Sequence, residues 1–373
     1  MNKLDIGNLP IWLGSQKTSR IEVVPFGFEV GERGLIRMAN QQIIARMVEG
    51  YADNEYHFIT SPPGASDWGN VLAGKSLSGL QKTYGDLQGK RILEIGGGTL
   101  YSAEFLVQQC RAAHVTVVDP ALKQVSRDPR VTIVSDYYSA EMRFAAQFDL
   151  IISFNTLEHV RDPLGFLSAI RSNLAENARL YLKLPDSGNS LAIGDLGLCV
   201  HEHLSYFTAE SLDVCLQAVG LERVAHANYP GALQILAQKS EPDASAHSST
   251  SATLLSSFAT RYKGHLQALD HQIESTGFKS VGFVGASVGL CNVLYLNRLH
   301  ERLKVGIFDN DSLKHGEYLP GIDTPIQEPT EETLAVYDAL FIAPVNFFEE
   351  IKDGLRAGNR LVGKPILPVF ELR

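Results

Sequence analysis

The stretch VHEHLSYFT, residues 200–208, places two histidines on either side of a glutamate. Histidine titrates near neutral pH and a neighbouring carboxylate can orient its ring, so His201, Glu202 and His203 have the residue types of a base with its supporting groups. A zinc site needs more ligands, and no cluster of cysteines or histidines lies nearby in the sequence. Because His201 and His203 alternate as strand residues do, we expect no metal here. Thr208 predicts the N-cap of a following helix.

An earlier glycine turn points to a bound ligand. In LEIGGGTLYSAEFL, an apolar strand runs into Gly96, Gly97 and Gly98 and then into a helix. Glycines allow a sharp turn and bring a ligand close to the main-chain N–H groups at the start of the helix. Asp119 ends the next strand about 20 residues later, where a carboxylate receives ribose hydroxyls. A dinucleotide site would have a third glycine near Tyr101, so the pattern favours a nucleoside ligand without a pyrophosphate.

Further polar residues follow the ends of the neighbouring strands. Glu94 lies within the first strand, Asp136 ends the third, and Phe154 and Asn155 end the fourth. A lone glycine turn is equally well explained as a tight connection, but the ordered series is not. The series resembles the class I methyltransferases that bind S-adenosylmethionine. The resemblance implies that the cofactor is bound by Glu94, Gly96, Gly98, Asp119, Asp136, Phe154 and Asn155.

The segment NTLEHVRDP, after the fourth strand, leaves two interpretations open. Glu158 and His159 have the types of an acid and a base. In such methyltransferases they more often line the cofactor or open the next helix. We favour this structural role.

The elements that must position these residues form two α/β units. Strand-like runs alternate with helical stretches from RILEIG to FDLIISF, which predicts a parallel sheet with helices on both faces. LERVAHANY and ALQILAQ predict an antiparallel edge pair. After a Ser/Ala/Pro-rich linker, apolar residues from Leu255 to Ile273 recur at helical spacing up to Gly277. KSVGFVGAS, LKVGIFDND and DALFIAPV then repeat the strand pattern.

At larger scale the chain resembles the S-adenosylmethionine-dependent C-methyltransferases that act on nucleotide-linked keto sugars. The shared segments are HEHLSYF, GFVGASVGLCNVLY and FDNDSLKHGEYLPGIDTPI, over about residues 85–373. The resemblance implies carbon methylation through an enolate, with His203 as the base, Glu202 as its orienting partner and His201 as a pocket or oxyanion donor. The acceptor is then a nucleotide-linked sugar. Asn310 and Lys314 are candidate contacts to its phosphates or sugar, or ordinary surface-loop residues, and Tyr206 is a candidate acceptor contact that packing explains better.

The implied architecture is α/β: a class I methyltransferase Rossmann-like domain, a second C-terminal Rossmann-like domain and a small N-terminal segment. We place an acceptor-capping segment at 1–80, the methyltransferase domain at 81–240, a linker and helix at 241–277, and an acceptor-binding domain at 278–373. In the capping segment, Tyr56, His57 and Ser61 are candidates to close over the acceptor, whereas Trp68 fits a core position. Gly285, Gly289 and Asp309 have the wrong spacing for an NAD site.

Two departures from the family keep other functions open. The family usually begins with a zinc domain of four cysteines, but the first cysteine here is Cys110, and Val200 stands where the family commonly has an aromatic residue. One alternative is an O- or N-methyltransferase that acts on a sugar or another small molecule. The other is a non-catalytic binding protein that retains the methyltransferase fold.

Composition limits the partners and the compartment. The 373 residues carry a formal net charge of −9, which argues against nucleic acid as the main partner. No apolar run approaches the roughly 20 residues that span a bilayer, and the first residues lack a signal peptide. Four scattered cysteines fit a reducing compartment. We therefore expect a cytoplasmic protein that acts on a small molecule; the sequence carries no signal for its oligomeric state.

Overall fold

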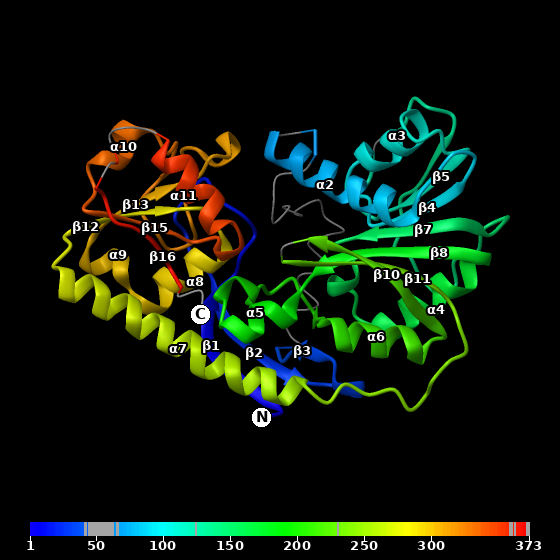
Figure 1. Cartoon of the computed structure of the whole chain (residues 1–373), viewed down its shortest axis with the longest axis horizontal. Helices are drawn as coiled ribbons and strands as arrows, with labels where there is room; N and C mark the ends of the chain where they lie inside the picture. Colours follow the sequence, from blue (N-terminus) through cyan, green and yellow to red (C-terminus); the bar gives the residue numbers. More distant parts are fainter. Residues whose placement is uncertain are drawn as a thin grey trace.

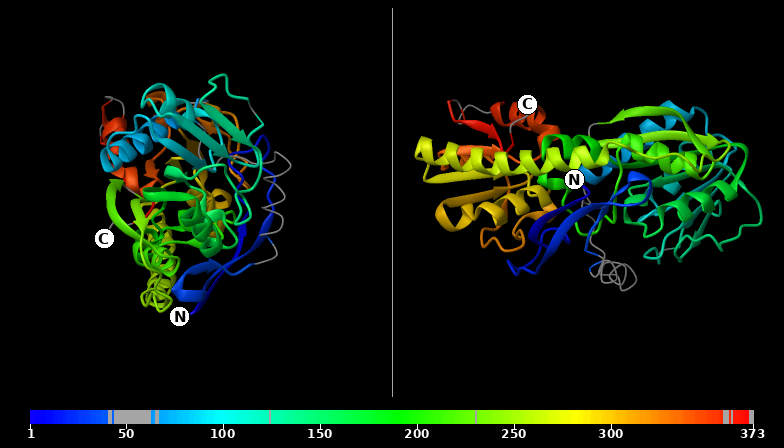
Figure 2. Two further views of the ribbon diagram at one scale, coloured as in Figure 1. Left: turned by 90° about the vertical axis from the view of Figure 1, so that its right-hand side faces the viewer. Right: turned by 90° about the horizontal axis from the view of Figure 1, so that it is seen from below.

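The computed structural model describes residues 1–40, 43, 63–64, 67–123, 125–229, 231–357, 361 and 363–370. Three sheets organise these residues (Figure 1). Two of them lie at opposite ends of the molecule, and the N-terminal sheet lies between them beside the long helix α7 (Figure 2). No helix in the described ranges is long and apolar enough to cross a membrane.

The central domain contains a seven-stranded sheet in the order β10-β11-β8-β7-β4-β5-β6. Its strands are β4 (Arg91–Ile95), β5 (His114–Val118), β6 (Val131–Val134), β7 (Phe148–Phe154), β8 (Leu174–Pro185), β10 (Leu221–Tyr229) and β11 (Ala232–Lys239). The strands from β6 to β8 are parallel, whereas β11 and β10 run antiparallel at one edge, which confirms both sequence predictions. Strand order reverses between β4 and β7, and α/β sheets bind ligands outside the carboxyl ends of such strands.

Helices cover both faces of this sheet. They are α2 (Asp67–Tyr84), α3 (Tyr101–Gln108), α4 (Pro163–Asn173) and α6 (Ala209–Ala218). Leu80 of α2 and Leu106 of α3 pack with Ile92 and Ile152 on one face. Side chains of α4 and α6 pack on the other face of the sheet, against strand residues such as Leu93 and Ile151. Because consecutive strand residues alternate between faces, a strand covered on both sides must be largely apolar, as β7 is from Leu150 to Ile152.

The N-terminal segment forms an antiparallel sheet that the sequence did not reveal. Its order is β1-β2-β3-β9, with β1 (Lys3–Pro10), β2 (Val23–Val30), β3 (Ile36–Met38) and β9 (Ser205–Tyr206); the short turn η1 (Glu32–Gly34) precedes β3. The register of β1 against β2 shifts between Asp5 and Gly7, which breaks the alternation that marks a strand. The fourth strand comes from the stretch just after His-Glu-His, so this sheet is joined to the candidate site.

The C-terminal domain contains a five-stranded parallel sheet in the order β14-β13-β12-β15-β16. Its strands are β12 (Ser280–Val284), β13 (Lys304–Phe308), β14 (Ile326–Gln327), β15 (Ala339–Ile342) and β16 (Ile366–Pro368). Its helices and short turns are α8 (Val288–Asn297), α9 (Leu299–Arg302), η4 (Ser312–Lys314), α10 (Glu331–Ala335), η5 (Val345–Phe347) and α11 (Phe348–Arg356). The predicted second α/β unit is therefore confirmed.

The predicted amphipathic helix is α7 (Ser251–Thr276), and it ends at Gly277 in the left-handed conformation, φ 70°. One large apolar cluster joins α7 to the N-terminal sheet, to the C-terminal sheet and to the segment before His-Glu-His. That segment contains α5 (Ser187–Ile193) and the short turn η3 (Leu196–Leu198).

Candidate active site

The glycine turn after β4 is built for close backbone approach. Gly96 has φ 77°, and a Cβ there would overlap the side chain of Thr156. Gly98 has φ 59°, and its N–H donates to a carboxylate oxygen of Asp119 over 2.8 Å. The second oxygen of Asp119 accepts the N–H of Ala121, also over 2.8 Å. The end of β5 is thereby held against the turn after β4.

A buried carboxylate lies beneath this turn. Glu94 is 2% exposed, and one of its oxygens has no hydrogen-bond partner among the described residues. Burial raises the pKa of Glu94 to about 8; a hydrogen bond with Ser102 opposes the shift and the charge of Asp119 adds to it. Such a group calls for a donor that the described residues do not supply. The ammonium group and ribose hydroxyls of S-adenosylmethionine are donors of this kind, so Glu94, Gly96, Gly98 and Asp119 fit this cofactor.

The other predicted cofactor residues follow along the same edge of the sheet. The ring of Phe154 lies edge-on to Tyr181, 6.0 Å between centroids. Asn155 is exposed, has φ 50° and donates its N–H to the carbonyl of Lys183 over 2.7 Å. Asp136 is exposed beyond β6, farther along the edge than Asp119. All three lie at carboxyl ends of parallel strands.

The His-Glu-His stretch forms a turn, so our expectation of strand alternation was wrong. The N–H of His203 donates to the carbonyl of Val200 over 3.1 Å, which closes the turn. The predicted N-cap of α6 is confirmed, since the Thr208 hydroxyl oxygen accepts the N–H of Ser211 and the Ser211 hydroxyl oxygen accepts the N–H of Thr208.

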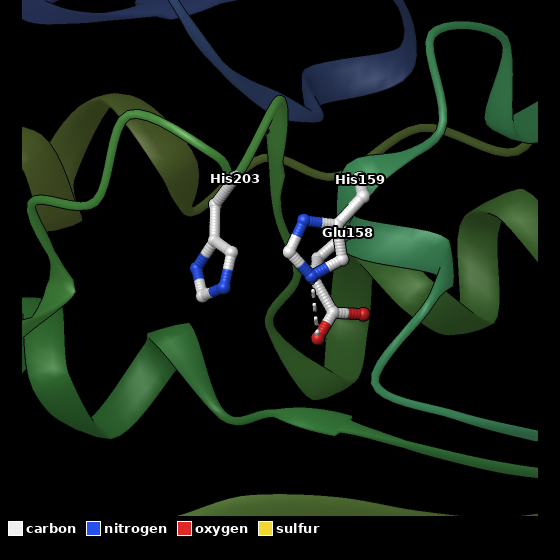
Figure 3. A group of neighbouring side chains, drawn as sticks. All are labelled: Glu158, His159 and His203. Atoms are coloured by element: carbon white, nitrogen blue, oxygen red, sulfur yellow. Dashed lines mark ion pairs between the residues drawn. The ribbon is translucent and has the colours of Figure 1, made fainter. Parts of the chain in front are cut away.

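Glu158 and His159 lie beside His203 (Figure 3). The His159 and His203 rings are 5.0 Å apart and edge-on, and Nε2 of His159 lies 3.8 Å from Oε1 of Glu158. The expectation that Glu158 and His159 open the next helix is incorrect. They occupy the short turn η2 (Leu157–His159), and α4 begins later, behind its own N-cap, Asp162.

Burial sets the charge of this cluster. It lowers the pKa of His159 to about 4 and that of His203 well below its ordinary range, so both rings are neutral at pH 7. It raises the pKa of Glu158 to about 8, against the effect of Lys183, and neither carboxyl oxygen of Glu158 has a hydrogen-bond partner within the described ranges. Lys183 is also buried; its pKa is lowered to about 8, and it donates to the Ser76 hydroxyl over 2.8 Å.

The cluster has the donor types of a metal site as well. Ligand atoms of Glu158, His159 and His203 lie within 4.8 Å of one another. From the sequence we expected no further metal ligand near His203, but the fold brings Glu158 and His159 next to it, so that argument was wrong. Nδ1 of His159 lies 3.0 Å from the carbonyl oxygen of Glu202, which leaves Nε2 turned towards Glu158.

Two of the residues predicted for the site, His201 and Tyr206, lie in the protein interior. His201 is fully buried with its ring edge-on to Phe26, 5.0 Å between centroids. Tyr206 is fully buried, and its hydroxyl donates to the Val200 carbonyl over 3.0 Å. The pocket role of His201 and the acceptor contact of Tyr206 stay predictions.

In the C-terminal domain the predicted acceptor residues lie after β13. Lys314 donates to Asp309 over 2.8 Å and to the Ala286 carbonyl over 3.0 Å, while Asn310 is exposed. Asp309 also accepts the N–H of Ala286 over 2.9 Å, as Asp119 does for Gly98. The carboxylate at the position that would bind a ribose in an NAD site is thus paired with a lysine. Tyr56, His57, Ser61 and the side chain of Trp68 lie outside the described residues.

Comparison with known families agrees with this arrangement. A methyltransferase domain matches residues 75–227, and a C-methyltransferase C-terminal domain matches residues 225–369. The chain belongs to the S-adenosylmethionine-dependent C-methyltransferases. The expected cofactor, fold class and enzyme class are thereby confirmed, and a non-catalytic binding role is set aside.

Individual relatives of this C-methyltransferase match it to different extents. The C-methyltransferase NovU of Streptomyces niveus is 23% identical over 337 residues, which is 83% of this chain and 80% of that protein. A ubiquinone biosynthesis O-methyltransferase of Xylella fastidiosa is 32% identical over 108 residues, 26% of this chain and 42% of that protein. The 1,6-didemethyltoxoflavin-N1-methyltransferase structure of Burkholderia thailandensis aligns with a TM-score of 0.38 at 16% identity, over 62% of this chain and 100% of that one.

Proposed function

We propose that this C-methyltransferase methylates the carbon next to the ketone of a nucleotide-linked keto sugar. The observation that carries the proposal is the buried pair of neutral histidines beside Glu158, next to the glycine turn of the cofactor domain. A neutral imidazole can accept a proton from a carbon near pH 7, and histidine is the residue most often used as a general base. The similarity to NovU across both domains and the resemblance of HEHLSYF to nucleotide-sugar enzymes support the acceptor class.

In this mechanism His203 accepts the proton from the carbon next to the ketone, and the electron pair of the broken C–H bond forms an enolate. When bound, S-adenosylmethionine supplies an electrophilic methyl group on its sulfonium. Glu94, Gly96, Gly98 and Asp119 hold the cofactor, with Asp136, Phe154 and Asn155 along the same edge. Holding the two reactants in line accounts for much of such a rate enhancement.

His159, Glu158 and Lys183 support the proton transfer to His203. His159 is held by the Glu202 carbonyl, which fixes its ring next to His203. Glu158 and Lys183 place a carboxyl group and an amine in the same buried region, where charge interactions are stronger than in water. We propose acid–base work for this cluster in place of metal binding, and Asn310 as a contact for the acceptor. Lys314 remains a candidate acceptor contact, although Asp309 already engages it.

The test is an assay with methyl-labelled S-adenosylmethionine and a panel of nucleotide sugars in deuterated water, with the label located by NMR. We expect the label on carbon, and deuterium next to the ketone when the cofactor is omitted. Label on oxygen or nitrogen would overturn the proposed reaction. The assay is repeated with a chelator, which should leave turnover unchanged if Glu158, His159 and His203 hold no metal.

A further inference from the structure

The loop that carries His203 is attached to the C-terminal domain by one fully buried side chain. Asn292 lies on α8 with no exposed surface. Its side-chain NH₂ donates to the carbonyl of Leu196 over 3.0 Å and to the carbonyl of Cys199 over 3.1 Å. Both protons of one nitrogen are used, so the two carbonyls are held at a set separation.

These two carbonyls lie at the start of a short run of backbone hydrogen bonds that ends at His203. The N–H of Cys199 donates to Leu196, and the N–H of Val200 donates to Leu198. The carbonyl of Val200 then accepts the N–H of His203 and the hydroxyl of Tyr206. A shift of Leu196 and Cys199 would therefore move the turn that holds the His203 ring.

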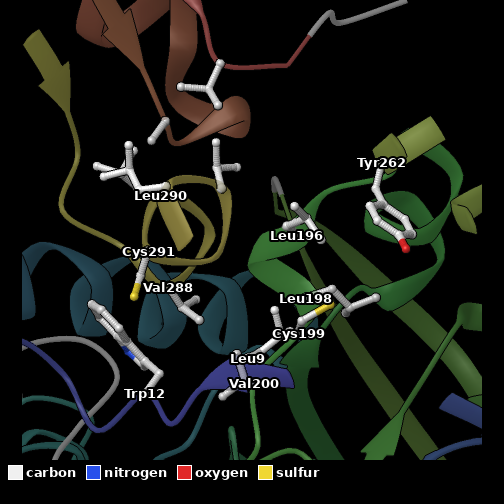
Figure 4. Close-up of a cluster of buried hydrophobic side chains, with 14 of the residues drawn as sticks. Leu9, Trp12, Leu196, Leu198, Cys199, Val200, Tyr262, Val288, Leu290 and Cys291 are labelled. Carbon is white, nitrogen blue, oxygen red and sulfur yellow. The ribbon is translucent and has the colours of Figure 1, made fainter. Parts of the chain in front are cut away.

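The helix and the loop also meet backbone to backbone. A Cβ on Gly289 of α8 would lie 3.1 Å from the Cα of Gly197, so only glycine allows this approach without displacement. Apolar side chains of the two segments close the contact from the sides (Figure 4). Those drawn include Leu196, Leu198, Cys199, Val200, Val288, Leu290 and Cys291. Inside such a cluster water does not replace a lost donor: the Cys199 carbonyl would lose the bond from Asn292, and the Leu196 carbonyl would keep only the N–H of Cys199.

We propose that Asn292 is a positioning residue through which the C-terminal domain fixes the loop that carries His203. The inference rests on the proposed role of His203 as the base. The C-terminal domain then has a second role besides acceptor binding. Through Asn292 it fixes the geometry of a site that lies in the methyltransferase domain. Catalytic groups must be held within a fraction of an ångström, so a loose loop reduces the chemical step before it affects cofactor binding.

The test compares Asn292→Leu, which keeps a similar volume and removes both donors, with Val293→Ala. Val293 is a matched control because it is buried in the same cluster on the same helix but donates no side-chain hydrogen bond. We expect Asn292→Leu to lower kcat about tenfold or more, with affinity for S-adenosylmethionine unchanged. Val293→Ala should lower thermal stability and leave kcat unchanged. Equal kcat in Asn292→Leu and wild type would overturn the proposal.

A second measurement does not depend on the acceptor. Backbone hydrogen exchange of the free protein should become faster over residues 196–204 in Asn292→Leu but not in Val293→Ala. If no nucleotide sugar is turned over by wild type, the proposed function fails, while the exchange result still decides the positioning role. Should Asn292→Leu not fold, Gly289→Ala replaces it and is expected to act in the same direction. Unchanged exchange and unchanged turnover in Gly289→Ala would contradict the inference.

Discussion

Asp119 and Asp309 hold equivalent positions in the two parallel sheets. Each follows the second strand of its sheet and accepts a backbone N–H from the turn after the first strand, over 2.8 Å and 2.9 Å. They differ in charge balance, because Lys314 pairs with Asp309. A comparison of the two aspartates can therefore distinguish the effect of holding the turn from the effect of binding a ligand.

Asp119→Ala should weaken the binding of S-adenosylmethionine about tenfold or more, since a hydrogen bond to a charged group contributes about 1.5–3 kcal/mol. Titration calorimetry measures the affinity directly. Asp309→Ala is the matched control: it breaks the same kind of turn contact in the other domain and should leave cofactor affinity unchanged. Equal losses in both variants would indicate a general effect on the fold and would remove Asp119 from the cofactor site.

His203→Ala should bind S-adenosylmethionine with normal affinity yet lose turnover by a factor of about 100 or more, as expected when a general base is removed. His226→Ala, an exposed histidine on β10, is the control and should behave as wild type. The turnover of each variant is measured with the acceptor found in the labelling assay. Near-normal rates in His203→Ala would assign the base to His159.

Glu158 makes stability depend on pH. Burial raises its pKa from 4.5 to about 8, so between these values the folded state binds more protons and stability falls as pH rises. Glu158→Gln removes this dependence. The free energy of unfolding of Glu158→Gln relative to wild type should increase by the order of a few kcal/mol between about pH 5 and pH 9. Urea unfolding at both pH values measures it, with exposed Glu176→Gln as the control; a difference that does not change with pH would show that Glu158 is not buried as a free acid.

In helix α7, replacing glycine by alanine should change stability in opposite directions at two positions. Gly277 ends the helix at φ 70°, where a side chain is strained, whereas Gly264 lies in the exposed helix interior with open space around it. Gly277→Ala should therefore destabilise the protein by about 1 kcal/mol, and Gly264→Ala should stabilise it by about 0.5–1 kcal/mol. Denaturant melts of the pair check the signs. A stabilising Gly277→Ala would contradict the left-handed C-cap.

At the scale of the whole molecule, one apolar cluster joins three parts of the chain that are distant in sequence. Phe28 of the N-terminal sheet meets Tyr206 of β9 and Phe258 of α7 edge-on, at 4.8 Å and 5.5 Å between centroids. Phe28 of β2 therefore links the strand that follows the His203 loop to helix α7. The cofactor loops lie apart from this cluster, in the seven-stranded sheet.

A chain without residues 278–373 should lose the C-terminal half of that cluster. We expect stronger binding of a hydrophobic dye, self-association and loss of turnover, because the exposed apolar face has no other cover. Every residue proposed for cofactor binding remains in such a chain. A truncated protein that stays monomeric, binds no dye and retains turnover would show that the C-terminal domain is not needed for the site.

The sequence by itself determined the local features of this protein. The strands from β4 to β7, the turn at Gly96, the N-cap Thr208 and the helix that ends at Gly277 were all predicted. Each of these signals is local, because side-chain alternation, turn glycines and capping residues act within a few positions of the backbone they shape. The cofactor class followed from the order of polar residues at strand ends, since parallel strands bring those ends to one edge.

Only the tertiary structure decided which distant segments meet. Glu158 and His159 join His203 because η2 and the His-Glu-His turn lie at the same end of the seven-stranded sheet, and no local pattern encodes that contact. The same holds for β9 in the N-terminal sheet, for the burial of His201 and Tyr206, and for the contact of Asn292 with the loop before His203. Such contacts depend on strand order and on packing between domains, which are properties of the whole chain.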